Sequence, residues 1–244
     1  MSDYYVGAVA RSGGWLAVVY TVDGYEETSV FEGIGELWDR YEESAARIGI
    51  DVPIGLEAAA APRPNERAAR EILGDRFDAV RFAPVREAAR KQRYRTAARV
   101  HERKTGAPLS RAAFERASHV AAVDEFLTAI DEARPIFSEL LPELCYLAFA
   151  GDAPKHSPEI ASGYAERMRA LATFDRDAPP TVQAVAEATD GRAFPVSAVL
   201  DAVAAALTVR PGDGELRSLP ADPPTDDERL PMAYVYRNEA PIDG

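Results

Sequence analysis

The stretch IGIDVPIGL, residues 48–56, decides the fold of this chain. It begins with a short apolar run typical of a buried strand, and a carboxylate, Asp51, follows directly. Pro53 cannot donate the next hydrogen bond of a central strand, so we expect the strand to end at the acid. A carboxylate there is costly to bury unless a turn hydrogen-bonds it or a site uses its charge. Asp51 is therefore either a structural residue or a site residue.

The sequence around this stretch predicts three strands before it and one strand well after it. The first three, at residues 4–10, 15–22 and 26–31, are separated by short turns that contain glycine. A helix opens near Gly33, and its apolar positions continue at helical spacing to Ile48. A fifth strand is expected at 134–139. The other predicted helices are 65–73, 86–105, a long one that Ser110 caps and that runs to about 130, one from 142, one from 157, 180–189 and 195–209.

This order of elements predicts an α/β fold. Three antiparallel strands extended by parallel ones give a mixed sheet with helices on both faces, which is the arrangement of the ribonuclease H-like fold. We expect one domain over residues 1–209, with a helical insertion at about 57–132. Residues 210–244 are rich in proline and aspartate and are expected to form a C-terminal tail. Within it, only 232–236 has the apolar character of a strand.

Composition narrows the class of protein. The 244 residues are 47% hydrophobic, which is enough for a packed core and excludes a disordered chain. No apolar run is long enough to span a membrane, and the first residues do not resemble a signal peptide, so we expect a cytoplasmic protein without a membrane partner. Cys145, the single cysteine, excludes an internal disulfide and lies in an apolar setting that predicts a buried thiol. The sequence leaves the oligomeric state open.

The charge of the chain is strongly negative. The net charge is −12, and only three of the 28 basic residues are lysines. An acidic, lysine-poor surface suits a cytoplasm of high ionic strength, where salt screens the repulsion between carboxylates. We therefore expect a halophilic protein, and loss of folding in low salt would support that expectation.

One segment opposes this average. Residues 63–116 contain 15 Lys and Arg against 7 Asp and Glu, a net of +8, so the rest of the chain carries −20. A basic block in an acidic protein predicts a surface for anions such as nucleic-acid phosphates. The alternative is a solvated helix whose arginines pair with acids elsewhere in the fold. The sequence does not decide between the two.

The chain resembles a known family through seven stretches in the same order. They are GAVARSGGW (7–15), IGIDVPIGL (48–56), RPNERAAR (63–70), AVRFAPVR (79–86), SELLPELCYLAFAG (138–151), KHSPEIASGYAERMRAL (155–171) and VLDAVAAALT (199–208). The resemblance is to the domain-of-unknown-function family numbered 429, described as predicted RNase H-like nucleases. The chain looks like a divergent, haloarchaeal-type member.

The resemblance implies metal-dependent hydrolysis of phosphodiesters. In such a mechanism carboxylates converge on one or two Mg²⁺ or Mn²⁺ ions, which activate water and stabilise the leaving oxygen. It implies Asp51, Glu143 and Asp201 as catalytic residues, with Asp51 and Asp201 as metal ligands. The three histidines lack zinc-like spacing. The expected nucleic-acid-binding residues are Arg63, Arg67, Arg70, Arg86, Arg90, Lys91, Arg93, Lys155 and Arg167.

The chain also departs from the family pattern at the expected site. Val9 stands where the family has its first aspartate, and Ser197 and Ala198 replace a pair of aspartates at the last helix. Leu141 replaces a histidine before Pro142 and Glu143. Because Mg²⁺ needs several fixed oxygen ligands, the loss of acids at Val9 and Ala198 puts a paired-metal site in doubt.

Three functions therefore remain open. The first is a metal-dependent nuclease, whose activity Asp51→Ala would abolish. The second is a catalytically inactive RNase H-like module that binds nucleic acid or a protein, with binding that survives chelation of metal. The third is a sugar-kinase-like ATPase, which the glycine-containing turn at 11–14 faintly favours and which ATP-dependent thermal stabilisation would support.

Overall fold

The computed structural model describes residues 3–74, 79–189, 191–192 and 194–242. They form two compact units, each described here by itself. Unit 1 comprises residues 1–51, 135–217 and 235–243. Unit 2 comprises residues 52–134 and 218–234.

Unit 1 is built on a five-stranded mixed sheet. Its strands have the order β3-β2-β1-β4-β5, in which β3, β2 and β1 are antiparallel and β1, β4 and β5 are parallel. This order confirms the predicted RNase H-like α/β topology. The bounds are β1 Tyr4–Arg11, β2 Gly14–Thr21, β3 Gly24–Phe31, β4 Ala45–Ile50 and β5 Phe137–Glu139.

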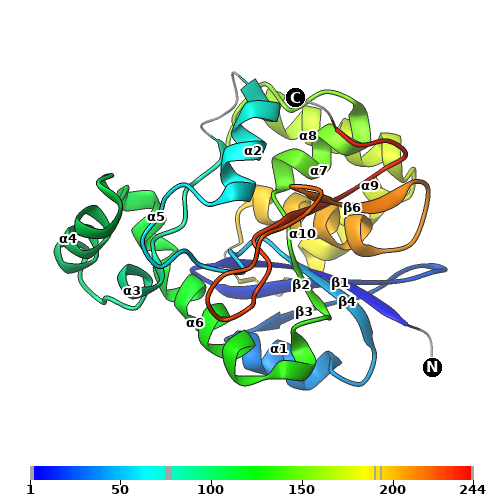
Figure 1. Cartoon of the computed structure of the whole chain (residues 1–244). Coiled ribbons are helices and arrows are strands. Elements are labelled where there is room, and N and C mark those ends of the chain that lie inside the picture. Colours follow the sequence, from blue (N-terminus) through cyan, green and yellow to red (C-terminus); the bar gives the residue numbers. More distant parts are fainter. Residues whose placement is uncertain (1–2, 75–78, 190, 193, 243–244) are drawn as a thin grey trace. The chain divides into compact units, whose positions relative to one another are not determined.

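Helices cover both faces of this sheet. Helix α10 (Val196–Val209) packs on β1, β2 and β4, and α1 (Ile34–Tyr41) lies on the opposite face against β2 and β3 (Figure 1). The other helices of unit 1 are α7 (Pro142–Ala150), α8 (Ala161–Phe174) and α9 (Ala178–Ala188), and both α7 and α9 contact α10.

The predicted continuation of the first helix to Ile48 is wrong. Helix α1 ends at Tyr41, and both Ala45 and Ile48 belong to β4. Apolar residues three or four apart fit a helix, but a short apolar run also fits a buried strand, and periodicity alone does not separate the two. Here the parallel pairing of β4 with β1 decides the outcome.

Helix α10 approaches β1 unusually closely because of Gly7. A Cβ atom at Gly7 would lie 2.1 Å from the backbone nitrogen of Ala206 and 2.3 Å from the carbonyl oxygen of Ala202. The facing part of α10 is rich in alanine, and every residue from Ser197 to Val209 is buried. Small side chains on the helix and none at Gly7 allow the two backbones to touch.

We predict that Gly7→Ala destabilises the protein by at least about 3 kcal/mol, because the new methyl group meets backbone atoms that cannot move aside. Gly35→Ala is the matched control, since nothing lies within 4 Å of a Cβ at that position in α1. The control should leave stability unchanged or raise it by less than about 1 kcal/mol. Urea unfolding of both variants measures the difference, and equal stabilities would contradict the close packing.

Unit 2 is helical. It contains α2 (Pro64–Leu73), α3 (Arg86–Ala89), α4 (Tyr94–Thr105), α5 (Arg111–Glu115), α6 (Ala117–Ala129) and η2 (Asp131–Ala133). The predicted single helix over 86–105 is divided, because Arg93 has an extended backbone and becomes the N-cap of α4. Ser110 caps a helix as predicted, and its side chain accepts a hydrogen bond from the backbone N–H of Ala113. The expected long helix after it is interrupted at Arg116, between α5 and α6.

The C-terminal segment contains more regular structure than predicted. Strands β6 (Glu215–Leu219) and β7 (Tyr234–Asn238) form a two-stranded sheet of their own. The second overlaps the one predicted strand of this segment. Among the described residues, no helix has both the length and the apolar character needed to cross a membrane.

Candidate functional site

The carboxylate of Asp51 is held at the end of β4. Its Oδ1 accepts a hydrogen bond of 3.1 Å from the backbone N–H of Ala10 in the neighbouring strand β1. Its Oδ2 accepts one of 2.6 Å from Nη1 of Arg11. Only 3% of the Asp51 side chain is exposed. The residue is thus fixed by the neighbouring strand, as a strand-end acid requires when it is buried.

Arg11 joins Asp51 to a second carboxylate. Its Nη2 donates to Oδ2 of Asp201 on α10 at 3.0 Å, so one guanidinium group bridges the two acids. The other oxygen of Asp201 accepts a 3.0 Å hydrogen bond from the hydroxyl of Tyr146 on α7. The structure thus brings together Asp51 and Asp201, two of the three predicted catalytic acids. The arginine that joins them lies 190 positions before Asp201 in the sequence.

The electrostatics of this cluster follow from burial and proximity. Burial raises the pKa of Asp201 to about 7, and the nearby Glu143 and Asp51 add to the effect while Arg11 opposes it. Burial alone would lower the pKa of Arg11, but the attraction of Asp51 and Asp201 outweighs it and raises that pKa. Burial also raises the pKa of Tyr146 well above its ordinary value, which keeps its hydroxyl protonated as a donor to Asp201. Because its pKa is raised, the Arg11 guanidinium stays positively charged between the two acids.

The third predicted acid has its own cation. Glu143, in the first turn of α7, accepts a 3.0 Å hydrogen bond from Nη2 of Arg167 on α8. Nη1 of the same arginine donates to the carbonyl oxygens of His156 and Gly163. Glu143 interacts electrostatically with both Asp201 and Arg11, so it belongs to the same charged region.

This arrangement does not fit a paired-metal site. Metal ligation by Asp51 and Asp201 needs free oxygens that point at a common position, and the Arg11 guanidinium is bonded to both acids there. Among the described residues, no three His, Cys, Asp or Glu side chains gather closely enough to hold a metal ion. Val9 and Ala198 are fully buried in one hydrophobic cluster, so methyl groups occupy both positions.

Sequence reasoning missed Arg11 and Tyr146. Arg11 was interpreted only as part of a turn, yet it ends β1 beside the end of β4. A signal was available, because two buried acids without a metal need another cation nearby. The sequence gives no sign of the role of Tyr146, because its hydroxyl bonds to Asp201 only through the packing of α7 on α10. Cys145 is buried as predicted, and burial raises the pKa of its thiol to about 12, which keeps it protonated.

Two of the arginines expected to bind nucleic acid are interior. Arg63, in unit 2, bonds to Glu66 at 2.9 Å and to the carbonyl oxygens of Ile54 and Gly55. Its side chain is 2% exposed, and that of Arg167, in unit 1, is 0% exposed. A guanidinium group in such a position holds loops together and does not reach a nucleic acid at the surface, so the prediction for these two residues needs correction.

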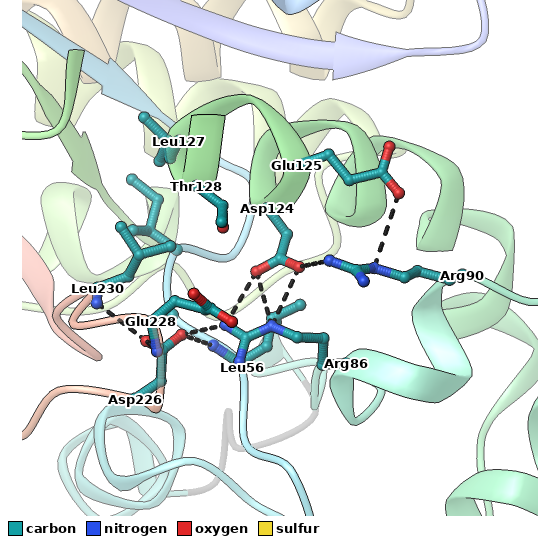
Figure 2. Close-up of polar contacts among 12 residues, drawn as sticks. Leu56, Arg86, Arg90, Asp124, Glu125, Leu127, Thr128, Asp226, Glu228 and Leu230 are labelled. Carbon is teal, nitrogen blue, oxygen red and sulfur yellow. Dashed lines mark hydrogen bonds and ion pairs between the residues drawn. The ribbon is translucent and has the colours of Figure 1, made fainter. Parts of the chain in front are cut away.

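Arg86 and Arg90 bond to the buried carboxylate of Asp124 in unit 2 (Figure 2). Arg86 bonds to Asp124 on α6 through Nε and Nη2 at 3.0–3.1 Å, and its Nη2 also bonds to Asp226. Arg90 donates to Asp124 at 2.9 Å. Asp226 in turn accepts from the backbone N–H of Leu56 at 2.8 Å and from two N–H groups of its own turn. These bonds attach the segment 218–234 to α3 and α6.

The other predicted basic residues differ in their surroundings. Lys91 lies 3.6 Å from Glu87, and the guanidinium group of Arg70 lies over the ring of Phe82. The backbone N–H of Lys155 donates to Glu166. Arg67 and Arg93 are exposed. Nucleic-acid binding by these five residues stays a prediction.

A pocket of about 730 Å³ lies elsewhere in unit 1, between α9 and the first turns of α8 and α10. Its lining is mostly apolar and includes Ile160, Tyr164 and Val196, which are exposed. None of the predicted site residues lines it.

Comparison with known proteins assigns the chain to a family. The family described as "Protein of unknown function (DUF429)" matches residues 3–225.

The chain belongs to the DUF429 family.

The match covers nearly the whole chain and continues past residue 209 into β6. No curated protein and no solved structure matches it. The family assignment from the seven sequence stretches is therefore confirmed, and its description names no activity.

We predict that Arg11→Met lowers stability by about 3 kcal/mol at pH 8, because it leaves Asp51 and Asp201 without their shared counter-charge. Asp201 has a higher pKa in the folded protein than in the unfolded chain, so the folded state binds its proton more tightly. The unfolding free energy of the variant should therefore recover as pH falls from about 8 to 5.

Urea unfolding at the two pH values checks this expectation. Adding Asp201→Asn removes one of the unpaired charges, so the double variant should lose less stability and show a smaller change with pH. A penalty for Arg11→Met that is identical at both pH values would contradict the assigned role of Arg11.

Proposed function

We propose that this protein is an RNase H-like module that binds nucleic acid and does not hydrolyse it by a metal-dependent mechanism. The observation that carries the proposal is the bridge from Arg11 to Asp51 and Asp201. The fold and the family membership leave hydrolysis open, so the argument depends on this site.

A guanidinium group bonds to both carboxylates and offsets part of their charge, but it cannot replace a metal in hydrolysis. It has no position for a bound water and does not act as a Lewis acid, so it cannot lower the pKa of an attacking water as Mg²⁺ does. Because Asp51 and Asp201 raise the pKa of Arg11, it is also unsuited to donate or accept a proton near neutral pH. The same bridge keeps the oxygens of both acids engaged.

The binding half of the proposal is supported by charge. The chain has 40 acidic residues, yet the segment 63–116 carries a net positive charge. Some arginines in it, such as Arg63 and Arg86, are held in ion pairs, but others are exposed, among them Arg93, Arg95 and Arg99. Exposed arginines on an otherwise acidic protein favour a polyanionic ligand, because the acidic remainder would repel it everywhere else.

A cleavage and binding assay on the full chain tests the proposal. Single- and double-stranded DNA and RNA are incubated with the protein in Mg²⁺, in Mn²⁺ and in EDTA. We expect binding in all three conditions and no cleavage in any of them. Asp51→Asn, which keeps an oxygen acceptor for the N–H of Ala10, should leave binding unchanged.

Two results would refute the proposal in different ways. Cleavage that requires Mg²⁺ or Mn²⁺ and disappears in Asp51→Asn would establish the nuclease instead. Absence of binding to every nucleic acid at low ionic strength would remove the binding half.

A further inference from the structure

We infer that one face of α4 is the surface that holds the phosphodiester backbone, and that it does so without regard to base sequence. The inference rests on the proposed function and assigns its binding surface. Arg95, Arg99 and Arg103 form what is called here the α4 arginine row, with Arg93 at the N-cap of the same helix.

The row follows from helix geometry. Its members are four residues apart, so they lie on one side of α4 and advance by about 6 Å per step, or about 12 Å in all. All three are exposed, and 67% of the Arg103 side chain is accessible. The opposite face of α4 is fixed in unit 2, because Ala97, Val100 and His101 are buried there.

The row is unfavourable for the isolated helix. Like charges four residues apart on a helix repel, and salt bridges normally offset such repulsion. In the part of the chain that the structure describes, Arg93, Arg95 and Arg99 form no ion pair, and Arg103 comes no closer than 3.8 Å to Glu87. Elsewhere in unit 2, Arg63, Arg86 and Arg90 are paired with acids, whereas the positive charge of the row stays available to a ligand.

Neighbouring residues extend the same charge. Arg111, the first residue of α5, is exposed and its guanidinium group lies over the ring of Tyr94 at 4.5 Å. The hydroxyl of Tyr94 donates to the carbonyl oxygen of Leu109, which fixes the ring at the start of α4. Glu102 is the single acid in α4.

The chemistry of the row favours nucleic acid over a membrane surface. A helix that lies on a membrane inserts exposed apolar side chains, and α4, which the structure describes in full, exposes none of its large ones. A strand of B-form DNA carries one phosphate per about 3.4 Å along the axis, so about 12 Å spans three to four phosphates. Evenly spaced arginines suit such a regular ligand, and contacts to phosphates carry no sequence information.

The test measures binding in EDTA to labelled single-stranded DNA, duplex DNA and RNA of arbitrary sequence. Affinity is followed between about 50 and 200 mM salt for the wild-type chain and for Arg95→Gln with Arg99→Gln. For duplex DNA we expect the slope of log affinity against log salt to become shallower by about 2, one unit for each arginine. Affinity at the lower salt should fall at least about tenfold.

The matched control is Arg169→Gln with Arg176→Gln. These arginines are exposed in and just after α8 of unit 1, and the double change removes the same net charge. The control should bind with the wild-type slope. Circular dichroism melting verifies that both double variants fold, and Arg99→Gln alone should show half of the change in slope.

The outcomes separate this inference from the proposed function. Binding by the wild type that the α4 change and the control weaken equally would overturn the α4 surface and leave the proposed function in place. No binding by the wild type would overturn both. Binding of both proteins to anionic vesicles is measured in parallel. If the α4 variant lost vesicle binding and kept nucleic-acid binding, the row would be assigned to a membrane and the inference overturned.

Discussion

The structure of unit 1 depends on the contact between the backbones of β1 and α10. Gly7 has no side chain, and α10 presents alanines to it, so the helix lies directly on the central strand. Asp201 sits on α10 beside Ala202, whose carbonyl oxygen faces Gly7, and Arg11 ends the strand on which Gly7 lies. The close packing therefore determines how far Asp201 is from Arg11, and so whether the two can bond. A longer separation would leave Asp201 buried without its counter-charge, which is strongly destabilising.

One cation, Arg11, thus bonds to two carboxylates, Asp51 and Asp201, at the place where the family resemblance implies a metal. The protein keeps the sheet, the strand-end acid and the last helix of an RNase H-like fold. It closes the charged site internally, with Arg11 between the acids and Arg167 on Glu143. The arginines of unit 2 have two kinds of surroundings. Arg86 is paired with Asp124 and Asp226, whereas the arginines of α4 are exposed to solvent.

The sequence was sufficient for the sheet and insufficient for the pairing of charges. Short runs of strand length bounded by glycine turns predict strands, because a helix needs a longer run and the turns set where each strand ends. The end of α1 was misplaced since Ala45 and Ile48 satisfy both periodicities, and pairing with β1 is a long-range effect. Asp51 and Asp201 could be named because each lies in a recognisable stretch. The burial of Arg63 and Arg167 could not be predicted, because the sequence around a basic residue does not indicate which acid it will pair with in the fold.

The network around Asp226 has a consequence for where the folded unit ends. The family match stops at residue 225, one position before the side chain that bonds to Arg86 and to the backbone of Leu56. A chain shortened at that limit would leave the Leu56 N–H and part of the Arg86 guanidinium without acceptors inside unit 2. The segment that the sequence predicts as a tail is thus an internal part of the helical unit, and the limit of the family match sets its boundary too early.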